Sequence, residues 1–168
     1  SSAIKKGIYD HLEFLINDNL GWYFAISAIT KYELINQSTI QLEVAREKML
    51  KGIKCFPITL PVIRIAGRLS CFYKQSLTIP DEQIEIPDKI IAGTAMQTGA
   101  VICTTNPSDY PMPFFSELRP YRKIVEHPNK FGYPGFVPIY IMVPERQTLT
   151  SYWQERIGPV KKKKVAKK

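Results

Sequence analysis

This sequence lacks the features that mark membrane-spanning, secreted or nucleotide-binding proteins. It has no secretory signal and no apolar run that approaches the length of a transmembrane helix. It also has no glycine-rich phosphate-binding loop, because Gly132 and Gly135 flank Tyr133 and Pro134 as in a turn. We therefore expect a cytoplasmic protein that does not bind a membrane.

Cysteine and histidine are both scarce. The three cysteines are widely separated, form no CxxC pair and lie in apolar segments: Cys55, Cys71 and Cys103. An odd number without metal-ligand spacing predicts reduced core residues rather than a disulfide framework. A catalytic thiol would need a nearby base, and the two histidines, His11 and His127, lie in a helical pattern and a proline-rich region. The sequence therefore does not favour Cys–His catalysis.

Positive charge is abundant but unevenly distributed. The formal net charge is +8, and six lysines lie in the last eight residues. Without these six lysines the rest of the chain carries only +2. Residues 159–168 thus form a basic tail with too little apolar surface to pack a core, which predicts disorder. Such a tail either strengthens salt-sensitive contact with RNA or DNA or solubilises the terminus.

The rest of the pattern predicts one α/β domain over residues 1–158. With 168 residues and 45% apolar content, the chain can bury a sizeable core. Apolar residues at helical spacing alternate with short apolar runs, as in a layered α/β domain. Residues 111–138 interrupt this pattern with prolines and aromatics, which disfavour long helices. In chain order we expect a helix at 4–16, a strand at 24–29, helical segments at 30–50 and a strand at 54–60. A helix from Pro61 follows, with Ile65, Leu69 and Phe72 on its inward face. We expect a further strand at 139–143 and a helix at 147–156.

The most informative segment is Ile86–Tyr110, which begins as a helix. Pro87 ends the preceding loop, and Asp88 stands where the helix begins. Apolar residues then recur at helical spacing: Ile91, Ala92, Ala95 and Met96. Gly99 is expected to end the helix. Asp88 is either an ordinary N-cap or a functional carboxylate at the start of this helix.

A short apolar run and a polar loop complete this segment. Ala100–Cys103 suits a buried parallel strand, and Asn106 and Asp109 lie in the loop that follows it. In open α/β sheets, ligands bind at the carboxyl ends of the strands. Asp109 is therefore either an ordinary turn residue or a second carboxylate that converges with Asp88 on one crevice.

A third carboxylate follows an earlier apolar run. Phe24–Ile29 has the length of a strand, and Glu33 lies shortly after it. Thr30 and Glu33 have the spacing of a capping box, in which Glu33 would only reach back to a backbone N–H. If Glu33 instead faces the same edge as Asp88 and Asp109, the three carboxylates repel one another. A Mg²⁺ or Mn²⁺ ion would relieve that repulsion.

Two blocks of the sequence resemble motifs of PIN-domain nucleases, most closely those of VapC-like toxins of toxin–antitoxin pairs. The block AISAITKYEL is similar to the second-strand motif, and PDKIIAGTAMQTGAVICTTNPSDY is similar to the third and fourth acidic motifs. They occur in the family's order within residues 4–110. The resemblance implies a three-layer PIN-like fold with a mostly parallel central sheet flanked by helices. It also implies a Mg²⁺- or Mn²⁺-dependent endoribonuclease.

The resemblance assigns roles to individual residues. Glu33, Asp88 and Asp109 would be the catalytic, metal-binding carboxylates, and Asn106 would assist or replace Asp109 as a ligand. The implied partners are RNA, a small antitoxin that covers the acidic site and a second copy of the chain. Several cations are candidates to neutralise the RNA backbone: Arg64, Arg68, Lys89, Arg119 and Arg122.

One element of the family pattern is missing from this sequence. PIN domains begin with an apolar strand that ends in an Asp, which is a principal metal ligand. No segment before Glu33 has that form, because Asp10 lies in a helical pattern and Asp18 in a polar turn. Either the sequence is a fragment without the first strand, or it is a degenerate relative with a weakened metal site. The alternative function is then a catalytically weak or inactive PIN-like module that binds RNA or assembles with protein.

Overall fold

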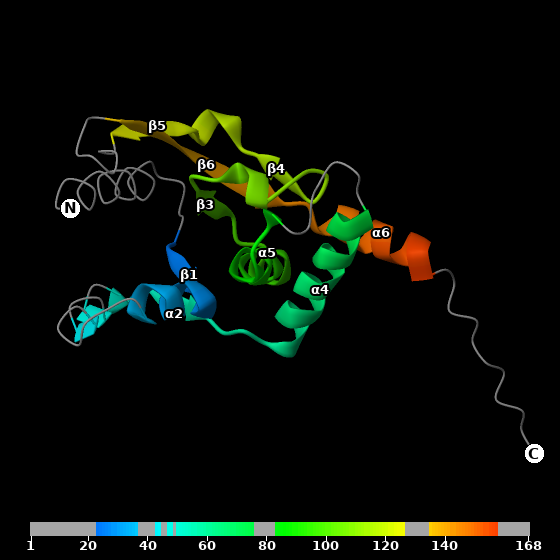
Figure 1. Cartoon of the computed structure of the whole chain (residues 1–168), viewed down its shortest axis with the longest axis horizontal. Coiled ribbons are helices and arrows are strands. Elements are labelled where there is room, and N and C mark those ends of the chain that lie inside the picture. The colour runs from blue at the N-terminus through cyan, green and yellow to red at the C-terminus, as the bar shows by residue number, and fades with distance from the viewer. Residues whose placement is uncertain are drawn as a thin grey trace, which may run out of the picture.

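The computed structural model is a mixed α/β arrangement of helices and two small sheets (Figure 1). It describes residues 23–36, 43–44, 47–48, 50–75, 83–126 and 135–157. The helices are α2 (Ala28–Asn36), α4 (Leu60–Gln75), α5 (Ile86–Thr98) and α6 (Arg146–Ile157), with 3₁₀ turns η2 (Pro107–Asp109) and η3 (Arg119–Tyr121). The strands are β1 (Ala25–Ser27), β2 (Lys54–Phe56), β3 (Ile102–Thr104), β4 (Phe115–Glu117), β5 (Lys123–Glu126) and β6 (Phe136–Pro144). None of the described helices combines the length and apolar character needed to cross a bilayer.

Some sequence predictions fall outside the described residues. These are the helix at 4–16, the basic tail at 159–168, part of the helical region at 30–50, and both histidines. The predicted helix from Pro61 is confirmed as α4, and the predicted helix at 147–156 is confirmed as α6. The predicted strands at 24–29 and 54–60 are shorter in the structure, where they form β1 and β2.

The first described strand leads directly into α2. Ser27 ends β1, and its Oγ accepts a 3.1 Å hydrogen bond from the backbone N–H of Thr30. This is N-cap geometry, and it starts α2 at Ala28 rather than at Thr30. Because Thr30 lies inside the helix, it is not the cap of a Thr30–Glu33 capping box.

Helices α4 and α5 cross at very close range. A Cβ atom at Gly93 of α5 would lie 2.7 Å from the carbonyl oxygen of Val62 and 3.2 Å from the backbone nitrogen of Ala66. Only glycine permits this approach of two backbones. As predicted, α5 ends at Gly99, which has the left-handed φ of 79°.

The longest strand, β6, organises the second sheet. Strands β3, β4 and β5 all pair with β6 in antiparallel orientation, with Ile102 of β3 opposite Met142 of β6. The described residues between 111 and 138 supply β4, β5 and the start of β6. Among the described strands only β1 and β2 are parallel, so the sheet is not mostly parallel as the sequence predicts.

The core lies among α4, α5, β6 and α6, and aromatic rings fill much of it. Phe72 of α4 stacks on Phe114 with ring centroids 5.5 Å apart, and Trp153 of α6 meets Phe72 edge-on at 6.1 Å. Figure 1 shows α6 beside the end of α4 where these rings meet. The predicted inward faces of α4 and α5 are confirmed by their buried residues: Leu69, Phe72, Ala92, Ala95 and Met96.

The cysteines are not core residues, in contrast to the prediction. Cys55, Cys71 and Cys103 are free thiols at exposed positions. In β3 the side chain of Ile102 points inward and is buried, which turns its neighbour Cys103 outward. Desolvation of the Cys103 thiol still raises its pKa to about 11, although much of the residue remains exposed.

Candidate functional site

Asp88 and Asp109 approach each other where α5 begins and β3 ends. Asp88 is the third residue of α5, after the N-cap residue Glu85, so Asp88 is not the cap of this helix. Asp109 ends the turn η2, which follows β3 closely. Both side chains are half-buried. Their carboxylates are near enough that the charge of Asp88 raises the pKa of Asp109.

Burial and charge repulsion act together on this pair. Burial is the main cause that raises the pKa of Asp88, and the charge of Glu85 adds to it. The pKa of Asp109 is raised first by burial, then by the charge of Asp88, and to a smaller extent by Glu85. The ionised form of both groups is therefore disfavoured in the fold, and a bound cation would reverse this effect.

Tyr110 supports Asp88 from the protein interior. Its ring is buried and meets Phe115 edge-on at 5.5 Å, and its hydroxyl donates a 3.3 Å hydrogen bond to Oδ1 of Asp88. This bond lowers the pKa of Asp88, against the effect of burial. Burial and the two carboxylates raise the pKa of Tyr110 itself, so the phenol stays protonated as a donor.

Asn106 organises the loop that carries Asp109. Its Nδ2 donates a 2.8 Å hydrogen bond to Oδ2 of Asp109, and its Oδ1 accepts one of 2.5 Å from the Ser108 hydroxyl. Its backbone N–H donates to Oγ1 of Thr104 at 3.0 Å. In this arrangement the Asn106 side chain orients Asp109, and only its remaining oxygen lone pair is available to a ligand.

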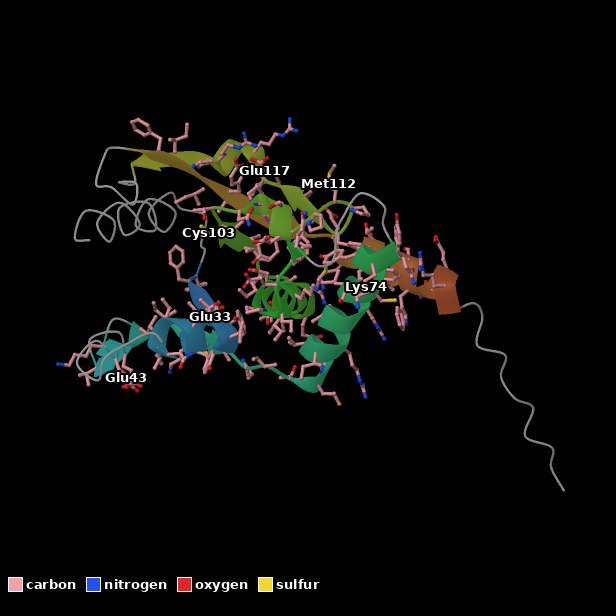
Figure 2. The ribbon with its side chains drawn as sticks, viewed as in Figure 1. Glu33, Glu43, Lys74, Cys103, Met112 and Glu117 are labelled. Carbon is pink, nitrogen blue, oxygen red and sulfur yellow. The ribbon has the colours of Figure 1, made fainter. Side chains whose placement is uncertain are left out.

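Glu33 does not join this pair in the structure. Figure 2 shows it on α2, which packs against α5, and its side chain is exposed. Glu33 is not among the charges that raise the pKa values of Asp88 and Asp109. Within the described residues, no three acidic, cysteine or histidine side chains lie close enough together to hold a metal ion. Because α2 begins at Ala28, Glu33 lies one turn deeper in the helix than the sequence suggests.

Two contributors to the site were missed by the sequence analysis, namely Glu85 and Tyr110. Glu85 precedes Asp88 by three residues, a spacing that places both on the same side of the helix start. Tyr110 directly follows Asp109, and a buried tyrosine hydroxyl normally has a hydrogen-bond partner. Both signals were present in the sequence, but the identity of the partner depends on the tertiary fold.

The cations expected to contact RNA lie in different surroundings. Arg64 and Arg68 lie on α4, where they line a groove with Trp153 of α6. Lys89 follows Asp88 directly on α5, and Arg119 is exposed in η3. These four positive charges therefore lie on three elements, α4, α5 and η3, rather than in one patch around the acidic pair.

Arg122 is neutralised by an acidic partner. Its Nε donates a 2.6 Å hydrogen bond to Oε1 of Glu117, and a second short bond joins Nη2 to Oε2. The guanidinium also lies 4.8 Å from the ring centroid of Tyr140. This bidentate pairing occupies the donors that a phosphate would need.

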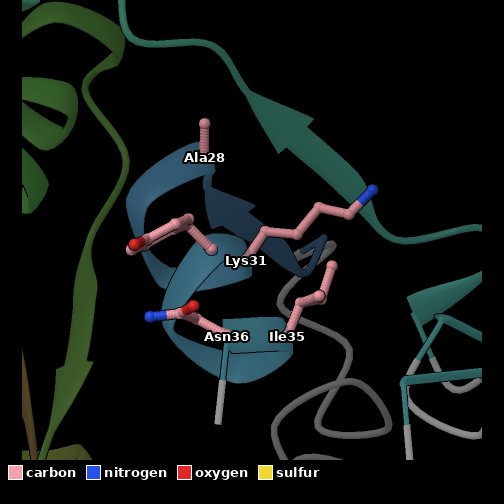
Figure 3. Close-up of a pocket in the computed structure, with 5 residues that line it drawn as sticks. Ala28, Lys31, Ile35 and Asn36 are labelled. Carbon is pink, nitrogen blue, oxygen red and sulfur yellow. The ribbon is translucent and has the colours of Figure 1, made fainter. Parts of the chain in front are cut away.

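A shallow pocket of about 310 Å³ lies on α2 (Figure 3). Its lining residues are Ala28, Lys31, Tyr32, Ile35 and Asn36. In Figure 3, Lys31 extends toward β2. No acidic residue lines the pocket, so it offers none of the carboxylates that a divalent metal prefers.

Comparisons with protein-family models, with curated proteins and with solved structures found no match to this chain. The resemblance to PIN-domain nucleases therefore remains a hypothesis that rests on the two motif blocks and on the geometry of Asp88 and Asp109.

Proposed function

We propose that this chain is a Mg²⁺- or Mn²⁺-dependent endoribonuclease of the PIN class, with a PIN-like layered fold. The observation that supports it best is the approach of Asp88 and Asp109, which are distant in sequence and share raised pKa values. The proposal includes a role as the toxin of a toxin–antitoxin pair in the cytoplasm. A small antitoxin and a second copy of the chain are its proposed protein partners.

The donors at the site fit a hard divalent cation. Mg²⁺ takes oxygen ligands, keeps several waters, and is often bound through one or two carboxylates beside substrate phosphates. Asp88 and Asp109 would supply these carboxylates, and the remaining oxygen lone pair of Asn106 could add a weaker contact. Glu33 lies apart from this pair, and it would act as a third catalytic carboxylate only if α2, which packs against α5, brought it to the bound ion.

The chain's own residues fix the two carboxylates in place. Tyr110 donates a hydrogen bond to Asp88, and Asn106 donates one to Asp109. A bound divalent ion would supply an activated water and would stabilise the charge that develops on the phosphodiester. Lys89, next to Asp88, is placed to neutralise the RNA backbone.

Cleavage of a labelled RNA tests this proposal. Mg²⁺ or Mn²⁺ should support cleavage, EDTA should abolish it, and Asp88→Asn should slow it by about 10²–10³-fold, since one charge-stabilising group is lost. Glu47→Gln is the matched control because it neutralises one exposed carboxylate outside the site. Cleavage at an unchanged rate in EDTA, or in the Asp88→Asn variant, would overturn the proposal.

The second candidate is a PIN-like module with little or no catalysis. The observation in its favour is that Glu33 lies apart from Asp88 and Asp109, so that only two of the three expected carboxylates gather. In the same assay this module would bind RNA in the presence of Mg²⁺ without cleaving it. Cleavage itself therefore discriminates the two candidates. If cleavage occurs, Glu33→Gln shows whether Glu33 takes part, because it should slow the reaction only in that case.

A further inference from the structure

A groove between α4 and α6 combines arginine side chains with an aromatic ring. Its volume is about 310 Å³, and its lining residues are Arg64, Gly67, Arg68, Cys71 and Trp153. Arg64 and Arg68 lie about one helical turn apart on the same side of α4. None of the lining residues is acidic, and the sequence of α4 contains no Asp or Glu at all. The groove therefore presents positive charge without a local counter-charge from α4.

Trp153 holds Arg68 in a way that leaves its donors available. The guanidinium carbon of Arg68 lies 4.2 Å from the centroid of the Trp153 ring. This cation–π contact requires no N–H···O hydrogen bond, so it does not use up the donors of the guanidinium as a carboxylate partner would. In the part of the chain that the structure describes, no carboxylate pairs with Arg64 or Arg68, unlike Arg122 with Glu117. Arg68 is thus pre-positioned for an anion.

A further arginine extends the positive surface along α6. Arg156 lies three residues after Trp153, and its guanidinium carbon is 5.4 Å from the centroid of Phe72. Phe72 belongs to the same aromatic cluster as Trp153. Aromatic rings of the core cluster thus contact two guanidinium groups at the protein surface, one on α4 and one on α6.

We propose that this α4–α6 groove binds the phosphate backbone of single-stranded RNA, with Arg64 and Arg68 on phosphates and Trp153 as the aromatic platform. Surfaces for single-stranded nucleic acid combine cations with aromatic rings in this way, and guanidinium groups bind phosphate through paired hydrogen bonds. A groove of this volume accepts a group of nucleotide size rather than a folded domain. The choice of RNA as the ligand rests on the proposed function. The positive charge of the groove is observed independently of that function.

Cys71 in the groove gives a readout on the unaltered chain. Cys55 on β2 is also an exposed free thiol and serves as an internal control. The protein is mixed with an oligouridylate in EDTA, which prevents metal-dependent cleavage, and is then alkylated with iodoacetamide. Peptide mass spectrometry should show that RNA slows alkylation of Cys71 several-fold relative to Cys55. Equal rates with and without RNA, or equal slowing at both thiols, would overturn the proposal.

An acidic protein segment is the competing occupant, and the same experiment distinguishes it. An oligoglutamate peptide replaces the RNA at equal charge. Protection of Cys71 by the peptide, without protection by RNA, would assign the groove to a protein partner and reject the RNA proposal. Protection by RNA that the peptide cannot compete away supports the proposal.

The salt dependence of binding separates a phosphate contact from a structural role for Arg68. In fluorescence anisotropy with EDTA, Arg68→Gln should weaken RNA affinity about tenfold, in line with loss of a charge-assisted hydrogen bond. It should also reduce the slope of log affinity against log salt by about 0.7. Lys54→Gln is the matched control, because Lys54 also lies over an aromatic ring, 5.0 Å from the Phe56 centroid, but is not among the residues that line the groove. An unchanged slope in Arg68→Gln would overturn the proposal.

Gly67 allows a test that leaves both arginines intact. A Cβ at Gly67 would meet no atom within 4 Å, so Gly67→Glu and Gly67→Gln both fit, and both side chains favour a helix over glycine. The two variants differ by one negative charge in the groove. RNA should bind the Glu variant more weakly than the Gln variant, and equal affinities would contradict the proposal. If RNA binds the groove but is not cleaved in Mg²⁺, the nuclease proposal is rejected and the groove proposal stands.

Discussion

The acidic pair and the basic groove both join a charged side chain to an aromatic residue, but with opposite consequences. At the acidic pair, Tyr110 donates a hydrogen bond to Asp88 in a half-buried setting, where burial raises the pKa of the carboxyl. At the groove, the face of Trp153 holds the guanidinium of Arg68 near solvent. Ionisation of the acidic pair therefore opposes folding until a cation binds, whereas the Trp153 ring face attracts the positive charge of Arg68.

A single helix crossing supports both regions. Helix α5 carries Asp88, and α4 carries Arg64 and Arg68, so the contact around Gly93 sets their relative position. A change in that contact should affect both regions together. A change within the acidic pair should leave the groove intact, and the reverse should also hold. Variants in each region therefore test whether the two regions are independent.

The largest expected effect comes from Gly93→Ala. The added methyl group would be forced against the carbonyl oxygen of Val62, which should lower the free energy of unfolding by about 3 kcal/mol. Metal-dependent cleavage and RNA binding should decline together, because the α4–α5 crossing shifts. Gly67→Ala, on the open side of α4, should instead raise the free energy of unfolding by roughly 0.5–1 kcal/mol. Urea denaturation measures both, and a stable Gly93→Ala protein would contradict the role of the crossing.

Stabilisation by metal should distinguish the acidic pair from the groove. A cation that binds only the folded state adds about 2.7 kcal/mol at a concentration of one hundred times its dissociation constant. Mg²⁺ or Mn²⁺ should therefore raise the unfolding temperature of the wild type and of Arg68→Gln, but not that of Asp88→Asn. Calorimetry with and without EDTA measures this difference. Equal stabilisation of all three proteins would show that the cation binds elsewhere.

Local sequence signals predicted the helices better than the sheet. Pro61 and Gly99 act within their own turns, so the start of α4 and the end of α5 follow from the sequence alone. The antiparallel partner of β3 is β6, which is distant in sequence, and no local pattern identifies it. At the start of α2, Ser27 and Thr30 are both good N-cap residues, and the structure places the cap at Ser27.

At the candidate site, too, local sequence signals do not identify partners that the tertiary fold brings together. The sequence anticipated that Asp88, at a helix start, and Asp109, after a strand, come together, although β3 is antiparallel to β6 and not part of the expected parallel sheet. The hydrogen bond from Tyr110 to Asp88 could not be anticipated, because it depends on where the tertiary fold places Tyr110 relative to the start of α5. The separation of Glu33 from the pair likewise reflects where α2 begins, which the sequence left ambiguous.

The pH dependence of stability offers a test without metal. Since the folded state raises the pKa values of Asp88 and Asp109, their stabilising effect is complete below the unfolded-state value of about 3.9. It is lost as the pH rises through the raised folded-state values. In EDTA, Asp88→Asn should therefore gain stability relative to the wild type between about pH 4 and neutrality. Arg68→Gln is the matched control, because it changes a charged side chain of the groove and leaves the acidic pair intact. A constant difference for Asp88→Asn would contradict the raised pKa.

The smallest expected effect comes from Tyr110→Phe, which removes one hydroxyl from the buried ring. The lost hydrogen bond to Asp88 should lower the free energy of unfolding by about 1 kcal/mol. Because that bond lowers the pKa of Asp88, its removal should shift the acidic limb of the pH–rate profile for RNA cleavage to higher pH. Tyr152→Phe is the matched control, since its exposed ring lies in the aromatic cluster near α4 and does not contact Asp88. A pH–rate profile that does not shift would show that Tyr110 packs in the core without changing the pKa of Asp88. The Tyr110–Asp88 contact and the Trp153–Arg68 contact would then be alike in geometry alone.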